Sequence, residues 1–166
     1  MDPAPPVYAA LEALGIAYER HEHPAVFTAE DASKFWDPIP GTQCKNLFLR
    51  NKKGDRHYLV VLEISKRADL KDLVKVVADD RLSFGSPERL MAELGLTPGS
   101  VSPFGLINDP DGSVRVILDK DLQGKPRLIF HPNINTASVV VSWDDLETFL
   151  KTRRNSVRIV TLAEGQ

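Results

Sequence analysis

The stretch CKNLFLRNKKGDRHYLVVL, residues 44–62, decides the fold, because it holds two apolar runs joined by a short polar segment. Residues 44–50 and 58–62 have the length and the Leu, Val and aromatic content of buried β-strands. Asn51-Lys52-Lys53-Gly54-Asp55 between them has the composition of a hairpin loop. The stretch therefore predicts a β-hairpin in the middle of the chain.

Helices and strands are interspersed on both sides of this hairpin. Pro5-Pro6 predicts the start of a helix that Gly15 ends, followed by a short strand from Ile16 to His21. Thr28-Ala29-Glu30-Asp31 predicts a short helix that ends near Pro38. Towards the C-terminus, helices are predicted over 70–77, 86–95 and 142–150, and strands over 114–118, 128–130, 137–141 and 157–162.

This order of elements predicts an α+β, or mixed α/β, fold. We expect a central mixed, largely antiparallel sheet or partial barrel surrounded by helices. No internal repeat, low-complexity tract or Gly/Ser/Pro-rich linker divides the sequence, and its 166 residues suit one domain. The expected domain therefore spans residues 1–166.

Composition excludes several classes of protein. A single cysteine excludes an internal disulfide framework and any multi-Cys zinc site. No apolar stretch is long enough to span a membrane, and the N-terminus lacks the pattern of a signal peptide. We therefore expect a cytoplasmic protein with no membrane partner.

The charge is small but unevenly distributed. A net charge of −2 argues against a generic polyanion-binding protein. Residues 41–81, however, hold ten basic and six acidic side chains, a net of +4. This basic segment could form a local patch, although an ordinary solvated surface would have the same composition.

The common catalytic and cofactor motifs are absent from the sequence. It contains no Gly-x-Gly-x-x-Gly, P-loop, His-Glu-x-x-His or Gly-x-Ser-x-Gly pattern, so we expect no cofactor. His21-Glu22-His23 offers two histidines without an evident third ligand, so we expect no metal either. Cys44, a lone cysteine in a β-rich run, is interpreted as a small buried apolar residue.

Lys45 is the most informative side chain. Strand alternation places it on the same face as Leu47 and Leu49, where a cation is out of place. One interpretation is that it sits at the strand start and extends to water. The other is a cation at the mouth of a cavity, available to a phosphate or a polarised carbonyl, and the pattern alone favours neither.

Two loops also carry candidate chemistry. Residues 99–105, GSVSPFG, form a loop of small residues whose glycines allow close approach of a ligand to the backbone. Residues 130–136, FHPNINT, concentrate a histidine, two amides and a hydroxyl between two apolar strands. Taken alone, each loop also fits an ordinary turn.

Taken in order, these segments resemble the YbaK/ProX-like aminoacyl-tRNA editing family. Cys44-Lys45-Asn46-Leu47-Phe48-Leu49 is similar to that family's lysine-bearing strand. Residues 99–103 are similar to its Gly-x-x-x-Pro loop, and residues 104–109 continue the likeness. His131-Pro132-Asn133 with Asn135-Thr136-Ala137 is similar to a third block. The resemblance covers nearly the whole chain and is strongest to the stand-alone ProX branch.

The resemblance implies a deacylase that acts in trans on Ala-tRNA(Pro), with the terminal ribose hydroxyl of the tRNA helping to activate a water. It implies catalytic roles for Lys45, Gly99 and His131. The substrate-binding residues that it implies are Asn46, Ser100, Val101, Ser102, Pro103, Val26, Phe27, Leu47 and Phe130. It also implies a monomer that meets prolyl-tRNA synthetase transiently. Two alternatives stay open: a Cys-tRNA(Pro) deacylase of YbaK type, and a non-catalytic tRNA-binding or synthetase-binding module.

Overall fold

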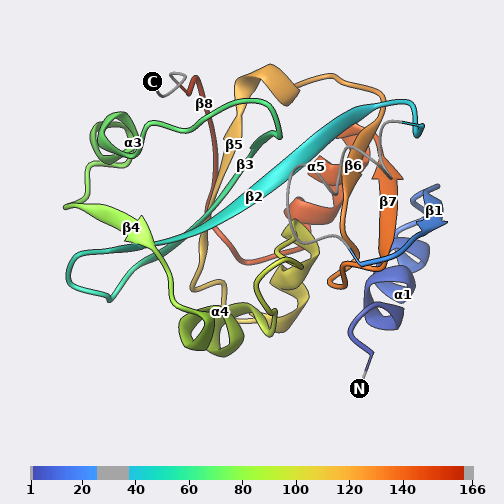
Figure 1. The fold of residues 1–166 in the computed structure, drawn as a ribbon, viewed down its shortest axis with the longest axis horizontal. Coiled ribbons are helices and arrows are strands. Elements are labelled where there is room, and N and C mark those ends of the chain that lie inside the picture. The colour runs from blue at the N-terminus through green and yellow to red at the C-terminus, as the bar shows by residue number, and fades with distance from the viewer. Residues whose placement is uncertain (1, 26–37, 163–166) are drawn as a thin grey trace.

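The computed structural model describes residues 2–25 and 38–162. Its helices are α1 (Pro5–Ala13), α3 (Leu70–Val77), α4 (Pro87–Leu94) and α5 (Trp143–Lys151), with 3-10 helices η1 (Pro103–Asn108) and η2 (Lys120–Leu122) (Figure 1). Its strands are β1 (Glu19–Glu22), β2 (Thr42–Asn51), β3 (His57–Glu63), β4 (Leu82–Phe84), β5 (Arg115–Asp119), β6 (Leu128–Phe130), β7 (Ala137–Val141) and β8 (Val157–Val160). The predicted helix near residues 28–38 lies outside the described residues.

The strands form one mixed sheet in the order β1-β7-β6-β2-β3-β5-β8, with β4 also paired to β2. The β1–β7, β2–β3, β2–β4 and β6–β7 pairs are antiparallel, and the β2–β6, β3–β5 and β5–β8 pairs are parallel. The predicted hairpin is confirmed as β2 and β3, paired from Cys44 opposite Glu63 to Arg50 opposite His57. The mixed α/β fold with a mixed sheet is therefore confirmed.

Strand β2 joins two halves of the sheet. Its first residues, Thr42 and Gln43, pair with Leu128 and Ile129 of β6, and its last three residues pair with β4. Between these points, residues 44–48 pair only with β3 among the residues that the structure describes. The edge of β2 is therefore unpaired over this stretch, where the sheet divides.

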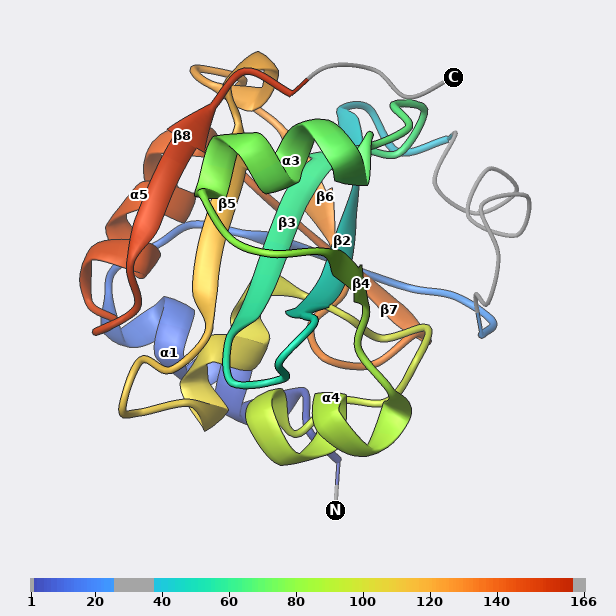
Figure 2. The same cartoon turned by 90° about the vertical axis from the view of Figure 1, so that its left-hand side faces the viewer.

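Apolar side chains fill both sides of the sheet. On one side, the core formed with α1, α4, η1 and α5 includes Phe104, whose ring meets those of Phe130 and Phe149 edge to face at 5.9 and 5.2 Å between centroids. On the other side, Leu73 of α3 packs with Leu49, Val60 and Leu62. Figure 2 shows α3 lying across the strands on this side.

Side-chain caps fix where the helices begin. Asp69 accepts hydrogen bonds from the N–H groups of Lys71 and Asp72 at the start of α3. Ser86 caps α4, and Ser142 caps α5, each through its hydroxyl oxygen. Gly95 ends α4 in the left-handed conformation with φ of 65°, as its position in the sequence predicts. In the described part of the chain, no helix has the length and apolar character needed to cross a membrane.

Candidate functional site

Lys45 lies on the unpaired stretch of β2, where the sheet divides. It is the fourth residue of the strand rather than its first, so its position is not that of a strand terminus. The register confirms the predicted alternation: Lys45 is opposite Leu62, and Leu47 is opposite Val60, both on the α3 side of the sheet. Lys45 therefore carries its charge on a largely apolar face.

The ammonium group of Lys45 has no acidic neighbour within ion-pair distance in the described part of the chain. Burial lowers the pKa of Lys45, and the nearby positive charge of Arg67 lowers it further. Both effects disfavour the charged form, and an anion bound beside the ammonium group would oppose both. The geometry is therefore that of a cation available to an anionic ligand.

Asn46 projects to the opposite face of β2, towards the core that holds Phe104 and Phe130. Its side-chain oxygen is buried and has no hydrogen-bond partner among the residues that the structure describes. The side-chain oxygen of Asn133 is also buried and without a hydrogen-bond partner among the described residues. The Nδ2 of Asn133 donates to the carbonyl of Phe104 at 3.3 Å. Buried polar atoms are seldom left unpaired, so these two amide oxygens are candidates to accept hydrogen bonds from a ligand or water.

The loop that begins at Gly99 is mostly internal. Gly99 has a φ of 89° and is partly exposed, as is Val101. Ser100, Ser102 and Pro103 are buried, and the Ser102 hydroxyl accepts from the N–H of Phe104 at the start of η1. The partly exposed residues of this loop are therefore Gly99 and Val101, while Ser102 holds the turn in place.

His131 follows β6 directly at the division of the sheet. Because β6 runs parallel to β2 with Ile129 beside Gln43, His131 and Lys45 each come two residues after that pair. The Nδ1 of His131 lies 3.2 Å from the carbonyl of Ala137, which can only accept, so this nitrogen carries the hydrogen and Nε2 is an acceptor. Burial lowers the pKa of His131 to about 4, so the ring is neutral near pH 7.

His23 is a neighbour of His131 that sequence reasoning considered only as part of a metal-like cluster. The two imidazole centroids are 6.5 Å apart. The Nε2 of His23 is 2.7 Å from the Ser138 hydroxyl, and its backbone N–H donates to Thr136. His23 comes directly after the end of β1 and is far from His131 in the sequence. No local sequence pattern could therefore have predicted that the two side chains are neighbours.

The remaining predicted residues are placed differently. Phe130 has no exposed surface, and its ring belongs to the core against Phe104, so it does not line a pocket directly. Leu47 is partly buried and packs with the α3-side core. Val26 and Phe27 lie outside the described residues.

Cys44 does not offer an activated thiol beside Lys45, and the described part of the chain offers no cluster of metal ligands. Cys44 is buried, and burial raises the pKa of its thiol. No group of three His, Cys, Asp or Glu side chains is placed to hold a metal ion among the described residues. The arrangement can position a water, bind an anion and accept hydrogen bonds, which suffices for hydrolysis of an activated ester.

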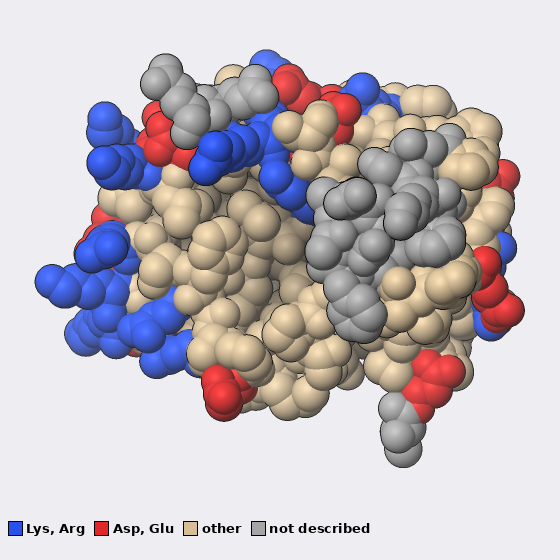
Figure 3. Space-filling view, in the orientation of Figure 1, with Lys and Arg blue, Asp and Glu red and all other residues tan. Residues whose placement is uncertain are grey.

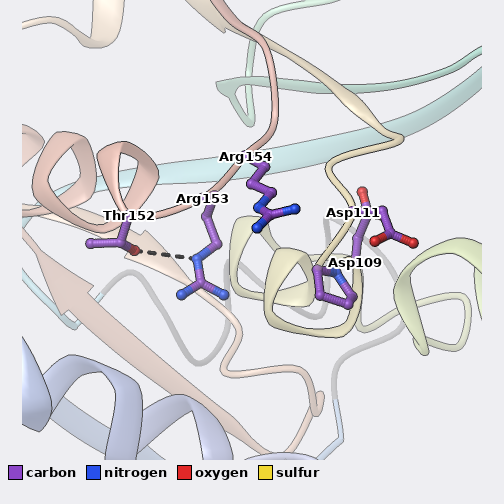
Figure 4. Close-up of a pocket in the computed structure, with 6 residues that line it drawn as sticks. Asp109, Asp111, Thr152, Arg153 and Arg154 are labelled. Atoms are coloured by element: carbon purple, nitrogen blue, oxygen red, sulfur yellow. Dashed lines mark hydrogen bonds between the residues drawn. The ribbon is translucent and has the colours of Figure 1, made fainter.

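A separate pocket of about 460 Å³ lies between the turn after η1 and the end of α5 (Figure 4). It is lined by Asp109, Pro110, Asp111, Thr152, Arg153 and Arg154. The Asp109 carboxylate accepts from the N–H groups of Ser113 and Val114 and from Asn155. These bonds hold the turn to the chain after α5, so the role of Asp109 in this pocket is structural.

Comparison with known proteins shows the family. The model of the aminoacyl-tRNA editing domain matches residues 23–149. The prolyl-tRNA editing protein ProX of Acetoanaerobium sticklandii is 42% identical over 162 residues, which cover 98% of this chain and 99% of that protein. The prolyl-tRNA synthetase associated domain-containing protein 1 of Bos taurus is 34% identical over 145 residues, which cover 85% of this chain and 84% of that protein.

A solved structure agrees with the sequence comparisons. It is described as a candidate trans-editing enzyme for prolyl-tRNA synthetase and superposes with a TM-score of 0.77 at 26% identity, covering 99% of both chains. The likeness spans the whole sheet and the helices around it. The chain therefore belongs to the aminoacyl-tRNA editing domain family.

Proposed function

We propose that this deacylase hydrolyses Ala-tRNA(Pro) in trans, releasing alanine from tRNA that prolyl-tRNA synthetase has charged wrongly. The observation that carries the proposal is Lys45, a partly buried cation with no acidic partner among the described residues. The near full-length likeness to a prolyl-tRNA editing protein supports the choice of tRNA.

Such an enzyme is needed because a binding pocket discriminates only weakly against an amino acid smaller than its own substrate. A pocket that accepts proline also admits the smaller alanine, because the missing side-chain atoms cost only about 1–3 kcal/mol of discrimination. A second site that admits only the smaller product can then remove the error. The proposed division of labour is a double sieve.

The proposed mechanism uses no covalent intermediate. An aminoacyl ester is already activated, so a water positioned over the carbonyl carbon can attack it directly. The adjacent ribose hydroxyl of the terminal adenosine would help activate this water. Attack forms a tetrahedral oxyanion, and collapse of that intermediate breaks the ester C–O bond to give free alanine and tRNA.

In this proposal, Lys45 anchors the terminal nucleotide through its phosphate and stabilises nearby negative charge. The backbone at Gly99, where φ is 89°, orients the aminoacyl group and the ribose hydroxyl. His131, held neutral by burial and by the contact of its Nδ1 with the Ala137 carbonyl, acts as a neutral polar group and not as a cation. Asn46 supplies a buried amide oxygen on the other face of β2.

Two other functions are the alternatives to this proposal. Hydrolysis of Cys-tRNA(Pro) needs the same machinery and differs mainly in the size of the amino-acid pocket. A non-catalytic synthetase-binding module is suggested by relatives such as the Bos taurus protein, whose name refers to prolyl-tRNA synthetase. Lys45 favours the enzyme: it is partly buried without an acidic partner among the described residues, and burying a charge is costly unless a counter-ion such as a phosphate binds beside it.

The test measures release of free amino acid from Ala-tRNA(Pro) and Cys-tRNA(Pro) beside binding of the same tRNAs. We expect catalytic release of alanine with the larger kcat/KM. Rapid loss of cysteine with alanine untouched would identify the YbaK-type activity instead. Binding of either tRNA without release of amino acid would contradict the enzyme proposal.

A further inference from the structure

We propose that the 3′ strand of the tRNA acceptor end lies along β2, from Lys45 towards the β2–β3 hairpin loop. In this arrangement, Phe84 stacks on an unpaired base, and a hairpin cluster of Arg50, Lys52, Lys53 and Arg89 binds phosphates. The inference rests on the proposed function, because that function places the terminal nucleotide at Lys45.

Phe84 is an exposed aromatic ring on the path. Its exposed fraction of 64% is the largest among the large apolar side chains in the described part of the chain. In the pairing of β4 with β2, Phe84 is directly opposite Leu49. Opposite residues of an antiparallel pair project to one face, so Phe84 lies on the same face as Leu49 and, by alternation, Lys45.

The spacing along β2 suits an unpaired tRNA end. Leu49 comes four residues after Lys45, about 14 Å further along the strand at strand geometry. At about 3.4 Å per stacked nucleotide, this is the length of roughly four nucleotides. Single-stranded nucleic acid is commonly held by exposed aromatic rings that stack on its bases, and Phe84 is suitably placed for this contact.

The hairpin cluster lies beyond Phe84 at the end of the hairpin, where Arg50 and Arg89 reach the loop from the α4 side of the sheet and Lys52 and Lys53 belong to the loop itself. The Arg50 guanidinium donates to the carbonyls of Asn51 and Lys52, both at 3.1 Å. The Nη1 of Arg89 donates to the carbonyl of Gly54 at 3.0 Å, so two guanidinium groups meet at one loop. Neither has a carboxylate partner within ion-pair distance in the described ranges, 2–25 and 38–162.

Lysines extend this positive surface, and two carboxylates lie beside it: Asp55, and Asp80, which accepts from the N–H of Lys52 at 2.7 Å. The side chain of Lys53 is 79% exposed, and its ammonium lies 3.9 Å from Asp55, whose carboxylate also accepts from Asn51 at 2.7 Å. Figure 3 shows Lys and Arg side chains gathered over the hairpin loop at the left edge of this face. Like charges held this close repel one another, and bound phosphates would relieve that repulsion.

The distance from Lys45 to the hairpin cluster indicates which part of the tRNA the cluster would bind. Lys52 comes seven residues after Lys45, roughly 23 Å along the strand and about seven stacked nucleotides. That length exceeds the unpaired end of a tRNA, so the cluster would meet backbone phosphates of the first base pairs. Such contacts position an RNA without reading its sequence.

The experiment compares two substrates: Ala-tRNA(Pro) and 3′-O-alanyl-adenosine, which has neither stacked bases nor a stem. Phe84→Ala is expected to lower kcat/KM for the tRNA by roughly 5- to 150-fold, the equivalent of one base-stacking contact. It should leave hydrolysis of alanyl-adenosine unchanged, and Phe84→Trp should restore the activity on tRNA. Met91→Ala, at an apolar side chain of α4 that is 50% exposed, is the matched control with no expected effect.

The hairpin cluster is tested by its salt dependence. Lys52→Gln with Lys53→Gln should weaken the activity on tRNA and lower the slope of log(kcat/KM) against log[salt] by roughly 2. The activity on alanyl-adenosine should again be unchanged. Wild-type behaviour of Phe84→Ala and of the double variant on tRNA, or an equal loss on both substrates, would overturn the path. A wild-type protein that hydrolyses neither substrate would instead contradict the proposed function.

Discussion

The positive charge of Lys45 is not stabilised by any acidic side chain within ion-pair distance in the described part of the chain. Its strand neighbours on the same face are apolar, and the nearest charge that affects it, on Arg67, is positive. A residue that served stability alone would be better replaced by a leucine or methionine at this position. In our proposal, the cost of keeping the lysine is offset by an anionic ligand, since the described part of the chain holds no acidic partner for it.

We predict that Lys45→Ala lowers kcat/KM for Ala-tRNA(Pro) by roughly 100- to 1000-fold, the loss typical of a removed charge-stabilising group. The free energy of unfolding should not fall, because no ion pair of Lys45 is lost among the described residues. Single-turnover deacylation and urea unfolding measure the two quantities. Cys44→Ser, the adjacent substitution on the core side of β2, is the control and should keep wild-type turnover. Full activity of the lysine variant would contradict the assigned role.

The burial of His131 predicts that the free energy of unfolding depends on pH. Its pKa is about 4 in the folded protein and about 6.5 when unfolded, so the unfolded chain binds more protons between these values. The resulting stability is complete above about pH 6.5 and is lost as the pH falls towards 4, by at most about 3 kcal/mol. Urea unfolding at pH 7.5 and 4.5 should show this loss for the wild type and a smaller one for His131→Gln. NMR titration with a midpoint for His131 near 6.5 would refute the burial argument.

At the scale of elements, the loop from Gly99 to η1 depends on backbone conformation. Gly99 has a φ of 89°, which residues with a Cβ rarely adopt, and Ser102 then fixes the turn into η1. We predict that Gly99→Val lowers kcat/KM and costs about 1–3 kcal/mol of stability through backbone strain. Kinetics and thermal unfolding of the variant, beside Gly124→Ala at a second glycine with a positive φ of 76°, provide the comparison. Normal kinetics in Gly99→Val would remove this loop from the site.

The connection between β3 and α3, which carries Arg67, is held by a buried ion pair. Lys66 donates to the fully buried Asp119 at 2.8 Å and to Asp121 at 3.0 Å. Burial lowers the pKa of Lys66, but the two carboxylates outweigh that effect and leave the pKa raised. Lys66 therefore ties the start of this connection to the end of β5.

We predict that Lys66→Met lowers the free energy of unfolding by about 3–5 kcal/mol, because it leaves the Asp119 carboxylate buried and unpaired. Chemical denaturation at pH 7 measures this loss. The double variant Lys66→Met with Asp119→Leu should recover much of the stability, since no unpaired charge then remains. Equal stability of Lys66→Met and the wild type would show that the ion pair does not hold this connection.

The sequence predicted those helices and strands whose formation depends on their own residues. The β2–β3 hairpin and the capped helices α4 and α5 follow from local apolar patterns and from Ser86 and Ser142. Strand β4 was missed, because its three residues form a strand only by pairing with the end of β2. The strand predicted over 157–162 ends at Val160, where its pairing with β5 ends.

At the candidate site, the sequence predicted the sheet face on which Lys45 lies, because alternation along a strand is a local property. It could not predict that Asn133 would adopt a φ of 65° and bond to Phe104, or that His23 would meet His131. These contacts join segments that are far apart in the chain. The burial of Phe130 likewise depends on η1 packing against it and is not visible in its own strand.

At the scale of the whole molecule, a net charge of −2 is compatible with binding a polyanion. Five of the ten basic residues of 41–81 lie in the β2–β3 hairpin, at 45, 50, 52, 53 and 56, so half of this segment's positive side chains belong to one hairpin. A protein that must release correctly charged tRNA gains from such a restricted surface, because a generally basic one would hold every tRNA through its phosphates.

The most direct test of the account is the rate of amino-acid release from Ala-, Cys-, Ser- and Pro-tRNA(Pro), with Ala-tRNA(Ala) as a second carrier. The account predicts that Ala-tRNA(Pro) is deacylated at least about tenfold faster than each of the others, a difference of about 1.4 kcal/mol in transition-state stabilisation. Stable Ala-tRNA(Pro) in the presence of active, folded protein would contradict it, as would faster hydrolysis of the cysteinyl or prolyl ester.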